Sequence, residues 1–214
     1  MAEVLELLPD FEGFAVKYDP DKNPFFRAIV VENLRKLATV AAGKSLLSSI
    51  AAADPRSRGT FPPKVNVVCI PRHINFTQSG FKRLVVYGSG GSESITGMQE
   101  TTQPQFSPKG CPFWIAGGSC NESVDQAAAT NANGSVCRMN FSNVQIITNK
   151  GETAFPFIVL AHELIHSLHC LEGIKIDGRD EELWTTGIGK YANNPMSENA
   201  FRNQFGLPLR TQYY

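Results

Sequence analysis

The stretch PFIVLAHELIHSLHCLEG, residues 156–173, decides how the rest of the chain is interpreted. Its apolar residues are dense enough for a buried helix, Pro156 suits the first helical position, and Gly173 suits the position after the last turn. Within that helix His162 and His166 are four residues apart, so their imidazoles project from one face about one turn apart. The sequence therefore predicts a buried helix with two imidazoles that can reach one metal ion.

The His-Glu-x-x-His spacing is typical of a catalytic zinc site. Both histidines can bind one Zn²⁺ at about 2.0–2.1 Å, and Glu163 lies beside them, too far round the helix to be a ligand. There its carboxylate can accept a proton from the water that attacks the substrate. Histidines that merely satisfy core hydrogen bonds are the alternative, but burying them with an acid among Leu and Ile would be costly without partners. We therefore expect one Zn²⁺ per chain.

A catalytic zinc ion has three protein ligands and one open position, so a third ligand is needed. His169 lies on the same stripe, but the first and third histidines are about 10 Å apart along the axis, too far to surround one tetrahedral ion. We expect His169 to orient a neighbouring group or the substrate. The acids that qualify as third ligand by position are Asp177, Asp180, Glu181 and Glu182. Periodicity alone does not choose among them.

The remainder of the chain predicts an α+β protein. With 214 residues, 42% of them apolar, the chain suffices for one compact domain over residues 1–214. Apolar spacing predicts a helix that begins at Pro24 with Asn23 as its cap and is interrupted at Gly43, then a second short helix that ends before Asp54. Segments rich in Val, Ile, Phe and Tyr predict strands over residues 64–70, 81–87 and 143–148. We expect N-terminal helices, a small mixed sheet and an active-site helix.

Net charge and the length of the apolar runs argue against two classes of partner, nucleic acid and membranes. Twenty Lys and Arg balance twenty Asp and Glu, so no overall field attracts a polyanion, and we expect no nucleic acid partner. The longest apolar run, residues 155–161, is far below the roughly 18–20 residues that cross a bilayer, so we expect no membrane association. Residues 1–14 carry four acids and no basic region, which does not fit a Sec signal and leaves export by another route open.

The long connection and the cysteines each allow two interpretations. The connection from Gly88 to Val136 is rich in Gly, Ser, Thr and Asn, and a segment of that length is either a substrate-contact region or a surface loop. The five cysteines are an odd number, so at least one thiol is free or pairs with another molecule. We expect reduced cysteines, although Cys111 and Cys120, which bracket a turn-rich loop, are candidates for a bridge.

Two segments resemble a known family of zinc proteases. The stretch HELIHSLH at 162–169 resembles the zinc helix of the clostridial neurotoxin light chains. The stretch EELWTTG at 181–187 resembles the segment from which those enzymes take their third ligand, the second of two glutamates. The resemblance implies that Glu182 is the third ligand and that Glu181 either supports the ligands or faces solvent.

The end of the chain extends the resemblance. Arg210-Thr-Gln-Tyr213 is similar to the Arg-x-x-Tyr signature that these proteases place across the zinc from the base, which implies that Arg210 and Tyr213 hold the oxyanion. Chain length and the stretches SENA at 197–200 and GLPLRTQY at 206–213 are even more similar to the NleD-type effector peptidases. These are small zinc proteases that bacterial pathogens inject into host cells, and some family members cut stress-activated MAP kinases. The match covers about a quarter of the chain.

The resemblance implies a zincin-like fold and a zinc-dependent endopeptidase of effector or toxin type. Its substrate would be a host protein, with a stress-activated MAP kinase as a candidate. The enzyme would be a monomer, secreted into the host cell by a non-Sec route and active in the host cytosol. One alternative is a zinc hydrolase with a non-peptide substrate, since the metal and the base accept other carbonyl groups. Another is a zinc-containing binding module, which would not need the acid Glu163.

Overall fold

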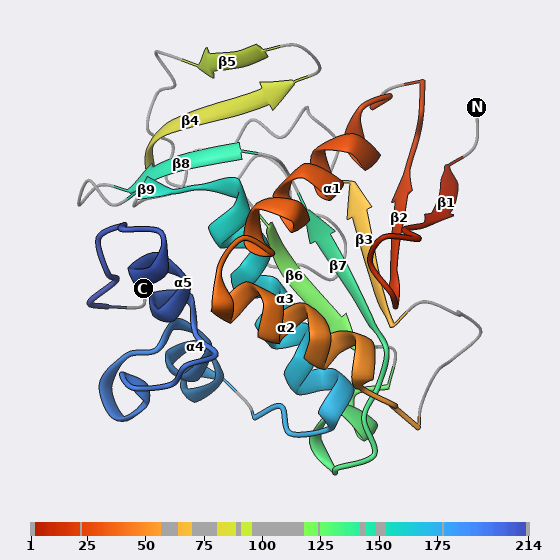
Figure 1. Cartoon of the computed structure of the whole chain (residues 1–214), viewed down its shortest axis with the longest axis vertical. Helices are drawn as coiled ribbons and strands as arrows, with labels where there is room; N and C mark the ends of the chain where they lie inside the picture. Colours follow the sequence, from red (N-terminus) through yellow and green to blue (C-terminus); the bar gives the residue numbers. More distant parts are fainter. Residues whose placement is uncertain are drawn as a thin grey trace.

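The computed structural model describes residues 3–21, 23–56, 64–69, 81–88, 91–95, 118–123, 125–141, 144–148, 153–176 and 178–212. A five-stranded mixed sheet forms the centre, with the strand order β1-β2-β3-β7-β6 (Figure 1). Strands β2, β3 and β7 run parallel, while β1 and β6 pair antiparallel with their neighbours. These strands are β1 (Val4–Leu7), β2 (Phe14–Tyr18), β3 (Val65–Cys69), β6 (Gly118–Ser123) and β7 (Cys137–Phe141).

A second sheet of four antiparallel strands has the order β5-β4-β8-β9. Its strands are β4 (Phe81–Gly88), β5 (Gly91–Ile95), β8 (Val144–Thr148) and β9 (Thr153–Ala154). The three predicted strands are confirmed as β3, β4 and β8, whereas the other strands were not predicted. The connection predicted between Gly88 and Val136 contains β5 and β6 rather than irregular chain alone.

Three helices pack together beside the five-stranded sheet, and two shorter ones follow (Figure 1). Helix α3 lies against β6 and β7 and is in turn contacted by α1, α2, α4 and α5. The helices are α1 (Phe26–Leu37), α2 (Ala41–Ala52), α3 (Pro156–Glu172), α4 (Arg179–Thr186) and α5 (Glu198–Gln204), with 3₁₀ turns η1 (Ala128–Thr130) and η2 (Gly189–Tyr191). The predicted α+β class and mixed sheet are confirmed. Among the described residues, no helix is both long and apolar enough to span a bilayer.

Two details of the N-terminal helices correct the sequence predictions. Helix α1 has Phe25 as its N-cap, so the predicted start at Pro24 with an Asn23 cap was wrong. The predicted interruption at Gly43 was also wrong, because this glycine lies inside α2. A Cβ atom there would be 1.9 Å from the carbonyl oxygen of Leu37. Glycine at this position therefore permits the close approach of α2 to the end of α1.

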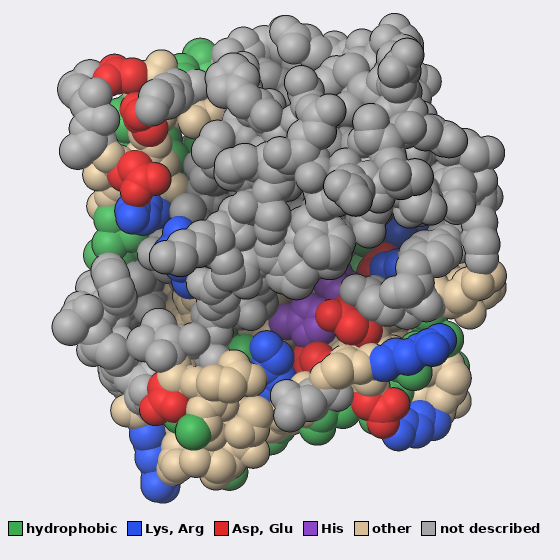
Figure 2. All heavy atoms as spheres, turned by 180° about the vertical axis from the view of Figure 1, so that it is seen from behind, with side chains coloured by type: hydrophobic (Ala, Val, Ile, Leu, Met, Phe, Trp, Pro, Cys, Tyr) green, Lys and Arg blue, Asp and Glu red, His purple; other side chains and the backbone are tan. Residues whose placement is uncertain are grey.

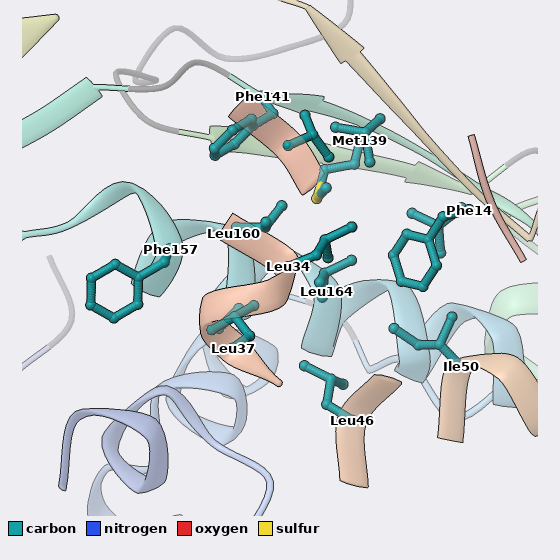
Figure 3. Close-up of a cluster of buried hydrophobic side chains, with 14 of the residues drawn as sticks. Phe14, Leu34, Leu37, Leu46, Ile50, Met139, Phe141, Phe157, Leu160 and Leu164 are labelled. Carbon is teal, nitrogen blue, oxygen red and sulfur yellow. The ribbon is translucent and has the colours of Figure 1, made fainter. Parts of the chain in front are cut away.

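Helix α3 begins and ends as predicted. Pro156 occupies its first turn, and Gly173 closes it in the left-handed conformation with φ 72°. All but two of its residues are buried, because the other helices and the sheet surround it. The main core joins this helix to the sheet through large apolar side chains (Figure 3), among them Phe14, Leu34, Leu46, Met139, Phe141, Leu160 and Leu164. The histidines of α3 are thus carried by the best-buried helix of the fold.

Candidate metal centre

Helices α3 and α4 bring three potential metal ligands together. The Nε2 atoms of His162 and His166 are 3.1 Å apart. The Oε2 atom of Glu182 lies 3.2 Å from the first and 3.3 Å from the second. A tetrahedral zinc ion with bonds of about 2.0–2.1 Å separates its ligand atoms by about 3.3–3.4 Å. The residues therefore fit one face of a zinc coordination sphere, and their donor set of two imidazoles and a carboxylate is one that zinc uses.

The other ring nitrogen of each histidine contacts a buried carboxylate. His162 Nδ1 lies 3.0 Å from Glu198 Oε2, and His166 Nδ1 lies 2.8 Å from Glu181 Oε1. Such contacts fix the orientation of each ring, so that Nε2 would face a bound metal ion. Both supporting carboxylates are 3% exposed. Each imidazole is thus held at Nδ1 by a carboxylate, and the two Nε2 atoms point toward the same place.

The three carboxylates around His162 and His166 favour a positive charge between the two imidazoles. Burial alone would lower the pKa of His162, but hydrogen bonds to Glu182 and Glu198 outweigh it and raise the pKa to about 9. Burial would likewise lower the pKa of His166, but Glu181 and Glu182 raise it to about 10. For Glu182 burial opposes ionisation, yet its bonds to both imidazoles hold its pKa far below the usual range. A divalent cation would satisfy the same carboxylates.

Glu163 lies beside this group on α3. Its side chain is buried, with 8% exposure, and interacts electrostatically with His162 and His166. Burial raises the pKa of its carboxyl group, and the two histidines offset only part of that rise. A carboxylate with a raised pKa accepts a proton more readily, which suits a general base.

His169 contacts the carboxylate that supports His166. Its Nδ1 atom lies 2.8 Å from Glu181 Oε1, and its ring stacks on Trp184 with centroids 3.9 Å apart. His166, His169 and Glu181 are a second group with ligand-type atoms close together. However, the other oxygen of Glu181 accepts the N–H of Ile176 at 3.2 Å, so this carboxylate already has partners on both oxygens. We therefore regard the second group as support for the first.

Sequence reasoning missed Glu198 as a site residue. Its carboxylate contacts His162 and also accepts from Arg202 Nε at 2.6 Å and from Arg210 at 3.0 Å. Burial would raise the pKa of Glu198, but Arg210, His162 and Arg202 together hold it well below the usual range. One signal in the sequence was available: Glu198 and Arg202 are four residues apart, directly after the helix cap Ser197, which is the spacing of an ion pair on one helix face.

Arg210 reaches the centre through Glu198. The side chain of Asn199 also fixes the Arg210 backbone, accepting from its N–H at 2.8 Å and donating to its carbonyl at 2.9 Å. The guanidinium group of Arg210 is thus held against Glu198, on the Nδ1 side of the His162 ring. Tyr213, predicted to act with Arg210, lies outside the described residues.

The remaining candidates from sequence are placed elsewhere. Asp180 forms an exposed pair with Lys190 at 2.7 Å. Asp177 and Cys111 lie outside the described residues, so their predicted roles stay predictions. On the face shown in Figure 2, histidine atoms are visible at the surface between acidic and basic side chains. The candidate centre therefore borders the molecular surface rather than lying sealed in the core.

Comparisons with known proteins give distant structural likenesses. No protein-family model and no curated protein matches the chain. It is similar to crystal structures of the botulinum neurotoxin type G and type D light chains, with 15% identity and a TM-score of 0.45 in each case. These matches cover 90% of this chain, and 55% and 58% of the light chains. The catalytic domain of Clostridium botulinum neurotoxin serotype F matches at 17% identity and a TM-score of 0.43, covering 87% and 50%. The chain spans about half the length of these structures.

Proposed function

We propose that the chain is a zinc-dependent endopeptidase with one Zn²⁺ held by His162, His166 and Glu182. The observation that carries the proposal is the triangle of 3.1–3.3 Å between two Nε2 atoms and one carboxylate oxygen. An acid follows directly after the first histidine on the same helix. A structural zinc site has no need of that acid, whereas a hydrolytic site does. Residues 1–214 would form a single metallopeptidase domain.

Glu163 is the proposed general base and later the general acid. A zinc ion bound here would supply Lewis acidity, polarising the scissile carbonyl group and lowering the pKa of a water molecule. Glu163 takes the proton from the attacking water and then donates it to the leaving amine. Its burial beside two imidazoles suits this cycle, because a raised pKa favours transient protonation.

Arg210 and Tyr213 are the proposed oxyanion stabilisers. Glu198 holds the Arg210 guanidinium at 3.0 Å while also contacting His162, so one carboxylate sets the positions of a ligand and of a cationic side chain. A donor that meets the developing oxyanion contributes about 2.7–4 kcal/mol to the stability of the transition state. The role of Tyr213 rests on its place in the Arg-x-x-Tyr motif.

For the substrate, we propose a host protein. The resemblance of the C-terminal quarter to NleD-type effector peptidases supports an effector or toxin that is injected by a non-Sec route and acts as a monomer in the host cytosol. The same resemblance makes stress-activated MAP kinases the first substrates to test.

Comparing protein termini in host-cell lysate tests the proposal. Lysate is treated with the wild-type chain or with Glu163→Gln, and new N-termini are identified by mass spectrometry. We expect termini that appear only with the wild type and that a chelator abolishes. Identical termini in both samples would show that the chain does not cleave proteins through Glu163.

Chelation also separates this proposal from a zinc-containing binding module. Removing the metal from a peptidase would abolish cleavage while the helices remain folded, because the core of this protein is built from apolar side chains and includes none of the proposed ligands. In a module with structural zinc, folding itself depends on the ion. Circular dichroism before and after chelation distinguishes the two.

A further inference from the structure

Two buried cysteines meet where the end of α3 packs on the start of β7. Cys137 is the first residue of β7 and Cys170 lies in the last turn of α3, with exposures of 2% and 0%. Together with Ala129 they form a small cluster apart from the main core. Both thiols are free, and neither has a role in the proposed peptidase chemistry. The pair is therefore available for other chemistry.

The surrounding contacts place the two cysteines beside each other. Cys137 Sγ lies 3.6 Å from the carbonyl oxygen of Ser167, one turn before Cys170. The backbone N–H of Ser135 donates to the carbonyl of Cys170 at 2.8 Å. The two thiols also lie close enough for each to shift the pKa of the other. Buried cysteines of one side-chain cluster on adjoining elements meet the first requirement for a disulfide.

The backbone on both sides of the pair is closely packed. A Cβ atom on Gly134 would be 2.0 Å from the carbonyl oxygen of Leu171, and one on Gly173 would be 2.7 Å from the N atom of Gly134. Ala132 also donates to the carbonyl of Gly173 at 2.9 Å. The chain segments that carry the thiols are thus held at a fixed separation.

The two thiols differ in reactivity. The hydrogen bond from Cys137 lowers the pKa of Cys170, and Lys175 acts in the same direction. Burial raises the pKa of Cys137. Because the thiolate is the attacking species, Cys170 is the first nucleophile of the pair.

We propose that Cys137 and Cys170 are a redox-sensitive pair that forms a disulfide by exchange with a small disulfide such as oxidised glutathione. The Cys170 thiolate attacks one glutathione sulfur, and the glutathione S–S bond breaks and releases one glutathione thiolate. Cys137 then loses its proton and attacks the Cys170 sulfur, which releases the second glutathione. Two protein thiols lose two electrons and two protons, and one oxidised glutathione becomes two reduced molecules. Since both thiols are buried, the first step takes place when this junction opens locally.

The disulfide fastens the end of the histidine-bearing helix to the central sheet. It closes a loop of about 34 residues, which restricts the unfolded chain and raises Tm by about 8–15 °C for a protein of this size. Excess reduced glutathione reverses the change. The pair thus makes the stability of the α3–β7 junction depend on the redox state of the surroundings.

Redox equilibration of the folded protein tests the inference. The full-length variant Cys69→Ser, Cys111→Ser, Cys120→Ser keeps only Cys137 and Cys170, and it is incubated with excess oxidised or excess reduced glutathione. Samples are quenched with acid, alkylated in denaturant and mapped as peptides without reduction. We expect a linked Cys137–Cys170 peptide, two hydrogen atoms lighter than the sum of the free peptides, only after oxidation. Tm should then be about 8–15 °C higher than in the reduced sample.

Two controls keep the outcome decisive. The variant Cys137→Ala, Cys170→Ala should show no difference in Tm between the two glutathione buffers. Peptide mapping of the wild type gives the same answer if the triple serine variant does not fold. Glutathione adducts without the linked peptide would overturn the inference, as would a linked form whose Tm is unchanged or lower.

Discussion

Replacing each of the two adjacent glutamates of α4 by glutamine is expected to weaken zinc binding to different extents. Glu182 Oε2 lies within 3.3 Å of both Nε2 atoms, and Glu182→Gln removes this anionic ligand. Zinc binding in four-ligand sites amounts to about 10–16 kcal/mol, or about 2.5–4 kcal/mol for each ligand. We therefore expect the zinc dissociation constant of Glu182→Gln to rise by about 10²–10³-fold.

Glu181→Gln should affect metal binding less and folding more. Glu181 does not contribute to the triangle of ligand atoms but supports His166, and losing such a support costs about 10–100-fold in metal affinity. Its two oxygens accept from His166, His169 and the N–H of Ile176. A glutamine can accept through one atom only, so its NH₂ group is left facing a donor in a buried place. The free energy of unfolding of the zinc-free protein should fall by about 1.5–3 kcal/mol.

Two measurements separate the effects. Competition with a coloured chelator gives the zinc dissociation constant, and thermal unfolding in the presence of a chelator gives the stability of the zinc-free protein. Glu182→Gln should lose less stability than Glu181→Gln, because its amide oxygen can keep the contact with the imidazoles and its NH₂ group can reach solvent. Asp180→Asn is the matched control, since this acid forms only an exposed pair with Lys190 and should change both quantities little. Weaker zinc binding in Glu181→Gln than in Glu182→Gln would refute the assignment of the third ligand.

Four other predictions concern Glu163, Tyr213, Glu198 and Gly43. Glu163→Gln should retain zinc, measured by elemental analysis, but lose at least about a hundredfold in kcat, because one side chain serves both proton transfers; normal turnover would exclude it as the base. Tyr213→Phe should fold normally by circular dichroism and slow the chemical step in single-turnover assays, and unchanged kinetics would move the oxyanion role elsewhere. Glu198→Gln should weaken zinc binding by about 10–100-fold in the chelator competition, since His162 loses its supporting carboxylate; unaltered affinity would contradict that role. Gly43→Ala should lower the free energy of unfolding by about 1–3 kcal/mol in urea titrations, because its Cβ would meet the Leu37 carbonyl oxygen; wild-type stability would mean that α2 can shift freely.

Local signals in the sequence were sufficient to predict where α3 begins and ends. Its apolar density, the proline at its start and the glycine at its end act within the helix itself, so they predicted Pro156–Glu172 closely. The positions of His162 and His166 on one face follow from the same helix geometry. Their convergence with a third group does not, since that depends on how α4 docks.

The features that local sequence patterns do not predict depend on tertiary contacts. Glu181 and Glu182 are neighbours on α4, and only the packing of that helix on α3 sends one to the Nε2 atoms and the other to Nδ1 of His166. Glu198 is on α5, whose contact with His162 has no signature in local periodicity. Strand β2 was missed because Phe14, Ala15 and Val16 are all buried, so it lacks the alternation that marks a half-exposed strand.

The order of the proposed site groups along the chain has a consequence for synthesis. The two histidines reside on a helix whose core partners come mostly from earlier residues, whereas Glu182, Glu198 and Arg210 all follow it. Proteins leave the ribosome N-terminus first, and their earlier parts can fold before later ones appear. A nascent chain in which α3 has just left the ribosome still lacks Glu182, Glu198 and Arg210, which complete the proposed site. If the proposed function holds, such an intermediate would have no peptidase activity until the C-terminal segments have docked.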